Sequence, residues 1–96
     1  MDTQPLHTKI DKIIQTRFGL VILEIPDRFP YTDSNLYCLA PNNKIVWKAE
    51  KPHPNTLFSR VRLNEDGATL STYTTGGHAC ELELSTGKLV SQSTIK

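Results

Sequence analysis

The chain has 96 residues, 38% of them apolar and 22% charged, which suits one ordered domain rather than a disordered segment. Eleven basic and ten acidic residues give a net charge of +1, so the basic excess typical of non-specific nucleic-acid binding is missing. The longest apolar run, Leu20–Leu23, is far shorter than the ~20 residues of a membrane span. We therefore expect neither nucleic acid nor a membrane as a partner.

The first half of the chain predicts two strands and a loop. Residues 6–15 fit either a short helix or a strand, and the lack of Ala and Glu together with the Arg17-Phe18-Gly19 turn favours the strand. Leu20–Ile25 is nearly continuously apolar, which predicts a strand that is central or covered on both faces. The loop at 26–34 contains two prolines, which cannot donate to a strand ladder.

The second half predicts a hairpin and then a meander. Asn35–Ala40 and Ile45–Glu50 flank the turn Pro41-Asn42-Asn43-Lys44, whose residues tolerate positive φ. Short glycine-containing turns join four further strands, so that sequential strands must be neighbours. These strands are Leu57–Leu63, Ala68–Thr74, His78–Leu84 and Lys88–Ile95. The predicted fold is a single all-β domain over residues 1–96, with seven to eight short antiparallel strands in a small sandwich or blade-like sheets.

Two segments carry a resemblance to a known family. Residues 35–48, Asn-Leu-Tyr-Cys-Leu-Ala-Pro-Asn-Asn-Lys-Ile-Val-Trp-Lys, resemble a blade hairpin of the PQQ-type β-propellers, and residues 81–90, Glu-Leu-Glu-Leu-Ser-Thr-Gly-Lys-Leu-Val, resemble a second one. The resemblance implies twisted antiparallel sheets with Trp47 in the core. It brings no quinone cofactor with it, because a propeller needs about four to eight blades and this chain has room for two at most.

By a weaker, class-level analogy the chain is similar to the small β immunity proteins that are encoded beside bacterial polymorphic and contact-dependent toxins. What they have in common is a length near that of this chain, blade-like hairpins, and no targeting signal or catalytic motif. The analogy implies a bacterial protein that binds and neutralises a cognate toxin, as in toxin–antitoxin pairs.

Strand alternation places one polar face across three strands of the meander. An arginine row and a glutamate row are expected ~10 Å apart, on either side of one strand. This is either a solvated face that keeps the domain soluble or a flat bipolar binding face with two aromatic anchors, since Arg and aromatic residues are enriched in interface hot spots. The candidate partner-binding residues are Phe58, Arg60, Arg62, Tyr73, Glu81 and Glu83.

The loop at 26–34 is a second candidate for recognition. Asp27, Arg28, Phe29 and Tyr31 would make it an exposed, aromatic-containing element between rigid strands. In the alternative, Phe29 caps the end of the core.

No residue pattern points to catalysis, a cofactor or a metal. The aspartates at 27, 33 and 66 lie in predicted turns, where Asp bonds to the local backbone, and no helix follows Gly76-Gly77 to hold a phosphate. The three histidines have no ligand spacing. Cys38 and Cys80 lack a CxxC spacing and point to the core, so free thiols are expected. The segment Met-Asp-Thr-Gln-Pro-Leu-His has no secretory pattern, which predicts a cytoplasmic protein.

The sequence thus predicts a non-enzymatic protein-binding module without a cofactor, most concretely an immunity protein. The alternative is a small-ligand or carbohydrate-binding accessory domain that uses exposed aromatic rings. A role in assembly also stays open, because terminal strands leave sheet edges that can pair with another chain. The sequence does not predict the oligomeric state.

Overall fold

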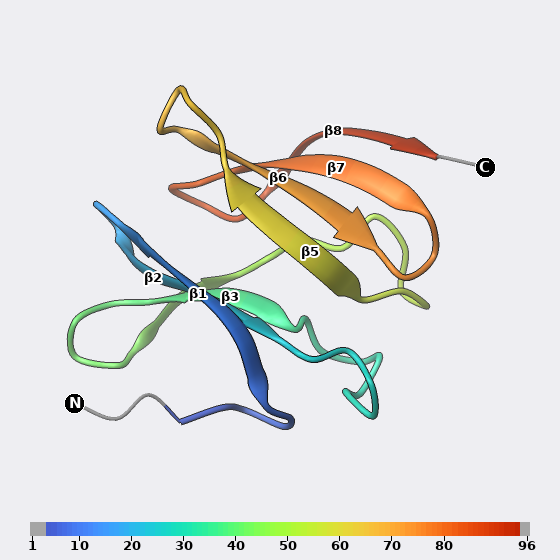
Figure 1. The fold of residues 1–96 in the computed structure, drawn as a ribbon, viewed down its shortest axis with the longest axis horizontal. Coiled ribbons are helices and arrows are strands. Elements are labelled where there is room, and N and C mark those ends of the chain that lie inside the picture. The colour runs from blue at the N-terminus through green and yellow to red at the C-terminus, as the bar shows by residue number, and fades with distance from the viewer. Residues whose placement is uncertain (1–3, 95–96) are drawn as a thin grey trace.

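The structure is a computed structural model that describes residues 4–94 (Figure 1). Within these residues it contains eight antiparallel strands in two four-stranded sheets and no helix, which confirms the all-β prediction. The segment that fitted either a helix or a strand contributes the first strand. The strands are β1 (Ile10–Thr16), β2 (Gly19–Glu24), β3 (Leu36–Leu39), β4 (Ile45–Lys48), β5 (Phe58–Leu63), β6 (Thr69–Thr74), β7 (His78–Glu83) and β8 (Leu89–Thr94).

Each sheet is a meander in which neighbours along the chain pair with each other. The sheet orders are β1-β2-β3-β4 and β5-β6-β7-β8, so the predicted hairpin and the predicted four-strand meander are both confirmed. The prediction of a central strand at Leu20–Ile25 is also confirmed, because β2 pairs with β1 and β3 and its last four residues are buried. The last predicted strand extended to Ile95, which lies outside the described residues.

The turn between β3 and β4 has the geometry that its residues predict. The Ala40 amide donates to the Lys44 carbonyl at 2.9 Å, and the Asn43 amide donates to the Ala40 carbonyl at 2.9 Å. Asn43 has a φ of 67°, a conformation that Asn adopts more readily than most residues. Turn chemistry therefore fixes where this hairpin reverses.

The main core lies between the two sheets. It includes Val21, Leu36 and Cys38 from the first sheet, and Leu70 and Leu82 from the second. Trp47 of β4 is only 7% exposed and its indole Nε1 donates to the Leu84 carbonyl at 2.8 Å, so the expected burial of this ring is seen. Burial of these side chains is the main force that holds the sheets together.

A second, smaller cluster covers the other face of the first sheet. Ile22, Tyr37 and Leu39 form it, with Leu6 and Ile10 packed against them. The fully buried carboxylate of Glu24 lies beside this cluster, at the end of β2. It accepts hydrogen bonds from three consecutive amides and a phenol; the donors are Leu6, His7, Thr8 and Tyr37. These bonds attach the segment before β1 to the sheet.

The ionisation of Glu24 follows from those bonds. Burial raises the pKa of Glu24, but the hydrogen bonds from Tyr37 and from the three amides outweigh it and hold the pKa below its ordinary value. Burial and the neighbouring Glu24 raise the pKa of Tyr37, which therefore stays a neutral donor. The Glu24 carboxylate is therefore ionised, and both of its oxygens accept hydrogen bonds within the fold.

The loop at 26–34 follows the alternative in which its first aromatic ring caps the core. Phe29 is 3% exposed and meets the His7 ring edge-on, with the centroids 4.9 Å apart. Asp33 lies within ion-pair distance of His7 and Lys48. Tyr31, at 54% exposed, is the aromatic residue of this loop that faces solvent.

Among the described residues, no helix has the length and apolar character needed to cross a membrane.

Candidate functional site

The edge strand β5 begins with a bulge that changes which side chains face outward. Phe58 pairs with Thr74 and Arg60 pairs with Tyr73, so two steps along β5 match one step along β6 and Ser59 is the additional residue. Phe58 is fully buried in the main core, on the same side as Val61. The prediction that Phe58 is an exposed aromatic anchor is therefore wrong, because simple alternation does not hold across a bulge.

The structure brings together three of the other predicted residues. Arg60 and Arg62 are exposed, and Tyr73 is half-buried directly opposite Arg60. Glu81 lies further along the sheet, in a row where Arg62 pairs with Ser71 and Ser71 pairs with Glu81. The two arginines and the tyrosine thus form a compact group, with Glu81 on the far side of β6.

Glu83 is not part of this group. It pairs with Thr69, and its carboxylate accepts hydrogen bonds from Ser85 Oγ at 3.2 Å and Thr86 Oγ1 at 2.9 Å. Its acceptors thus serve the turn between β7 and β8. The predicted glutamate row is therefore divided between an open surface at Glu81 and a local turn at Glu83.

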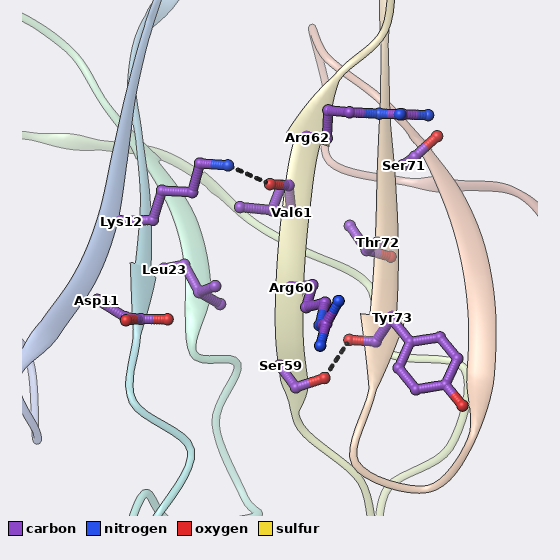
Figure 2. A pocket seen from close by; sticks show the side chains of 10 residues that line it. All are labelled: Asp11, Lys12, Leu23, Ser59, Arg60, Val61, Arg62, Ser71, Thr72 and Tyr73. Atoms are coloured by element: carbon purple, nitrogen blue, oxygen red, sulfur yellow. Dashed lines mark hydrogen bonds between the residues drawn. The ribbon is translucent and has the colours of Figure 1, made fainter.

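A cleft of about 460 Å³ lies where β1 approaches β5 and β6. Figure 2 shows β1 and β2 on one side and the arginine-bearing β5 on the other. The Lys12 ammonium crosses the gap and donates to the Val61 carbonyl at 3.0 Å. Asp11, Lys12, Leu23, Ser59, Arg60, Val61, Arg62, Ser71, Thr72 and Tyr73 line this space, which we call the cationic cleft.

Positive charge dominates the cationic cleft. Lys12, Arg60 and Arg62 line it, and Asp11 is the single carboxylate among its lining residues. Within residues 4–94, neither arginine side chain makes a hydrogen bond or an ion pair; both ion pairs found there involve Asp33. Two guanidinium groups two positions apart on one strand, together with a lysine across the gap, provide donors for an anionic group.

Backbone and hydroxyl contacts hold the rest of the wall in place. Ser59 Oγ donates to the Tyr73 carbonyl at 3.1 Å, which ties the bulge to β6. Ser71 Oγ donates to Asn64 Oδ1 at 2.7 Å. These bonds fix the strands that carry the arginines, while the guanidinium groups themselves stay free to meet a ligand.

The polar groups that line the cationic cleft are charged side chains and hydroxyls. Its lining contains no histidine or cysteine, and its serines hydrogen-bond to a backbone carbonyl and an amide oxygen rather than to a base.

The two cysteines lie in the core and do not line the cleft. Burial raises the pKa of both Cys38 and Cys80, and at Cys80 a hydrogen bond from Thr72 lowers the pKa in part. In the described part of the chain, no group of three His, Cys, Asp or Glu side chains is placed to hold a metal ion.

Sequence reasoning found Arg60, Arg62 and Tyr73 but missed Asp11 and Lys12. Lys12 and Val61 are 49 positions apart, and no turn or repeat in the sequence indicates that β1 lies beside β5.

No profile of a known protein family, no curated protein and no solved structure matches the chain. The function of the site is therefore inferred from its geometry and its residue types alone.

Proposed function

We propose that this chain is a non-catalytic protein-binding module that receives an acidic segment of a partner protein in the cationic cleft. The observation that carries this proposal is the pair Arg60 and Arg62, exposed in an open cleft with no carboxylate partner among the described residues. Charged groups on a surface are commonly paired or dispersed, whereas here two lie together beside an aromatic ring. Arginine and tyrosine are the residue types that concentrate binding energy in protein interfaces.

The charge distribution favours an acidic partner. The whole chain carries a net charge of only +1, so its attraction for anions is local to the cleft and does not extend over the surface. Bidentate bonds from guanidinium to carboxylate give both energy and orientation. Such pairs set the association rate and the register of a complex, and their effect weakens as salt screens them.

The most concrete form of this proposal is an immunity protein that neutralises a cognate bacterial toxin. A small β scaffold with a binding cleft and no chemistry of its own suits a protein that acts by occupying another protein's surface. A basic nuclease would not suit the cationic cleft, so the contact surface of the toxin is expected to be acidic. Inhibition then comes from steric cover of the toxin's active site.

The test is co-expression with the product of the adjacent gene, followed by affinity capture and a growth-protection assay. We expect capture and protection by the wild type, and loss of both in the double variant Arg60→Gln, Arg62→Gln. The control is Arg17→Gln, Arg28→Gln, which removes the same charge from two exposed arginines outside the cleft. Absence of any complex, or equal loss in both double variants, would refute the proposal.

A second candidate function is the binding of a small polar ligand. Half-buried Tyr73 and the hydroxyls of Ser59 and Ser71 line the same cleft, and an aromatic wall with nearby hydroxyls can hold a sugar ring. Thermal-shift screening with neutral sugars separates the two functions. Stabilisation that is lost in Tyr73→Ala but kept in the Arg60→Gln, Arg62→Gln variant favours the sugar.

A further inference from the structure

The four outer strands of the two sheets differ in how well they are protected from pairing with another chain. β1 carries Asp11 and Lys12 and is linked to β5 through the Lys12–Val61 bond. β4 has four residues, and its pairing with β3 is interrupted by a register shift. β5 has the bulge and two arginines. Charge, short length and bulges are the usual means by which natural proteins protect a sheet edge.

The fourth outer strand, β8, lacks most of this protection. Its six residues, Leu-Val-Ser-Gln-Ser-Thr, include no charge and no proline, and all but the first are exposed. Its one bulge falls at the start, where Val90 is the additional residue between the partners of Leu82 and Glu81, and the pairing is regular from Ser91 to Thr94. In Figure 1, β8 forms the outer margin of the second sheet.

The ladder pattern shows which backbone groups of β8 face outward. The Glu83 amide donates to the Lys88 carbonyl on the β8 side, and the Leu84 amide donates to the Ala68 carbonyl on the β6 side. Antiparallel bonding alternates, so the odd-numbered residues of β7 bond toward β8. Their partners Ser91 and Ser93 therefore direct their amide and carbonyl groups toward β7.

Past the bulge, the even-numbered residues of β8 are left for another strand. Gln92 and Thr94 direct their amide and carbonyl groups to the side of β8 on which no strand of residues 4–94 pairs. At the start of β8, the amide of Leu89 already donates to Glu50 Oε1 at 2.8 Å. The groups open to another strand are therefore those of Gln92 and Thr94, beyond the bulge at Val90.

We propose that β8 pairs with β8 of a second copy of this chain, antiparallel and about a two-fold axis at Gln92. This register places Gln92 opposite itself, within the part of β8 whose pairing is regular. It joins the two C-terminal sheets into one eight-stranded sheet.

A second copy is the occupant that β8 itself favours. A neutral strand can meet an identical strand without like charges opposing each other, which a strand such as β5 with two arginines cannot do. Val90, 60% exposed, lies at the bulge beside this paired segment and offers an apolar side chain to the second copy. A two-fold axis makes this contact closed and self-complementary, so it ends at a dimer and does not propagate into fibres. The cationic cleft lies at the opposite outer strand, β5, and remains open in the dimer.

Sedimentation velocity on the full chain tests this proposal. An interface of one strand is small and its affinity is weak, so the range runs from about 10 μM to about 1 mM. We expect a mass that rises from 10.8 kDa toward twice that value as the concentration increases. Gln92→Lys should weaken the dimer about tenfold or more at low salt, because two like charges then face each other across the axis. Gln15→Lys, the same change on exposed β1, should leave the dimer unchanged.

A cross-link gives a second readout that does not depend on affinity. Residues directly opposite in an antiparallel pair have Cα atoms about 5.5 Å apart when hydrogen-bonded, within the range of a disulfide. Gln92→Cys should therefore form a disulfide dimer under oxidation, and Gln15→Cys should not. The chain staying at 10.8 kDa over the whole range, or Gln92→Cys failing to cross-link, would overturn the proposal, as would a dimer that Gln15→Lys weakens as much as Gln92→Lys. Pairing of β8 only with a different protein would count against it in the same way.

Discussion

The side chain of Asn35 satisfies both backbone groups of Phe58. Its Nδ2 donates to the Phe58 carbonyl at 2.6 Å, and its Oδ1 accepts from the Phe58 amide at 2.8 Å. The same Nδ2 donates to the Glu24 carbonyl at 2.8 Å. One fully buried carboxamide thus connects the end of β2, at Glu24, to the start of β5, and so fixes how the two sheets meet beside the cationic cleft.

Replacing Asn35 should destabilise the protein strongly. Asn35→Ala leaves the amide and carbonyl of Phe58 and the carbonyl of Glu24 without these partners in a buried place. Each buried group that loses its partner costs about 1–3 kcal/mol, so we expect the free energy of unfolding to fall by about 3 kcal/mol or more. Urea denaturation followed by tryptophan fluorescence of Trp47 measures it.

The matched control is Asn55→Ala. Asn55 is exposed, and no hydrogen bond of its side chain is found within the described residues. Its replacement should change the free energy of unfolding by less than about 0.5 kcal/mol. Equal effects of the two substitutions would show that Asn35 does not connect the sheets as described.

Much of the fold follows from local sequence signals. The hairpin at residues 35–50 and the four-strand meander after it could be predicted, because proline, glycine and asparagine mark their reversals and short turns leave sequential strands no other neighbour. The first strand could not be told from a helix, and no local signal indicates that the strands divide into two sheets. Asn43 at φ 67° and Gly67 at φ 66° are turn residues in the conformation that their type favours. These features depend on a few adjacent residues, which is why the sequence alone reveals them.

The candidate site was harder to predict because it depends on relations between distant residues. Phe58 was assigned to the wrong face, since nothing in the sequence marks Ser59 as the additional residue of a bulge. Lys12 was missed because its neighbours in space come from β5, far along the chain. Arg60 and Arg62 were found because alternation holds after the bulge.

Two glycines with similar backbone angles should respond very differently to alanine. Gly67 has φ 66° and a Cβ there would meet nothing within 4 Å, whereas Gly87 has φ 73° and a Cβ there would overlap the Trp47 ring. Gly67→Ala should cost about 1 kcal/mol for the left-handed backbone alone. Gly87→Ala adds overpacking and should cost about 2–4 kcal/mol in total. Thermal unfolding checks this order, and similar losses in both would contradict the packing of Trp47 on Gly87.

The stability of the protein should fall in acid partly through Glu24. Its pKa in the fold lies below the ordinary value of 4.5, so the folded state binds fewer protons and ionised Glu24 stabilises the fold above that value. This contribution is lost as the pH falls through the folded pKa. Glu24→Gln should cost about 2 kcal/mol at pH 7 and flatten the loss of stability below pH ~5.

In the Glu24→Gln variant, Asp33 still contributes to the decrease in the free energy of unfolding as the pH falls. Burial raises the pKa of Asp33, but hydrogen bonds from Lys48, the Ser34 amide and His7 outweigh this effect and hold the pKa below its ordinary value. The comparison of wild type and variant by urea denaturation at several pH values isolates the share of Glu24. An unchanged slope would mean that Glu24 has the same pKa in the folded and unfolded chain.

The two thiols should be unreactive in the native protein. Cys38 and Cys80 are buried, and burial raises the pKa of both, so little thiolate is available to a reagent. Titration with a coloured disulfide reagent should detect neither thiol at pH 8 within minutes, and both after denaturation. Rapid reaction of the folded protein would show that the core opens more readily than its packing indicates.

The central claim is that the cationic cleft binds an anionic protein segment, and NMR titration with a hexaglutamate peptide tests it most directly. We predict amide shift changes confined to Lys12, to residues 59–62 and to residues 71–73, which weaken with salt and vanish in the Arg60→Gln, Arg62→Gln variant but persist in Arg17→Gln, Arg28→Gln. Shift changes spread equally over all basic residues, or lost equally in both variants, would contradict the claim.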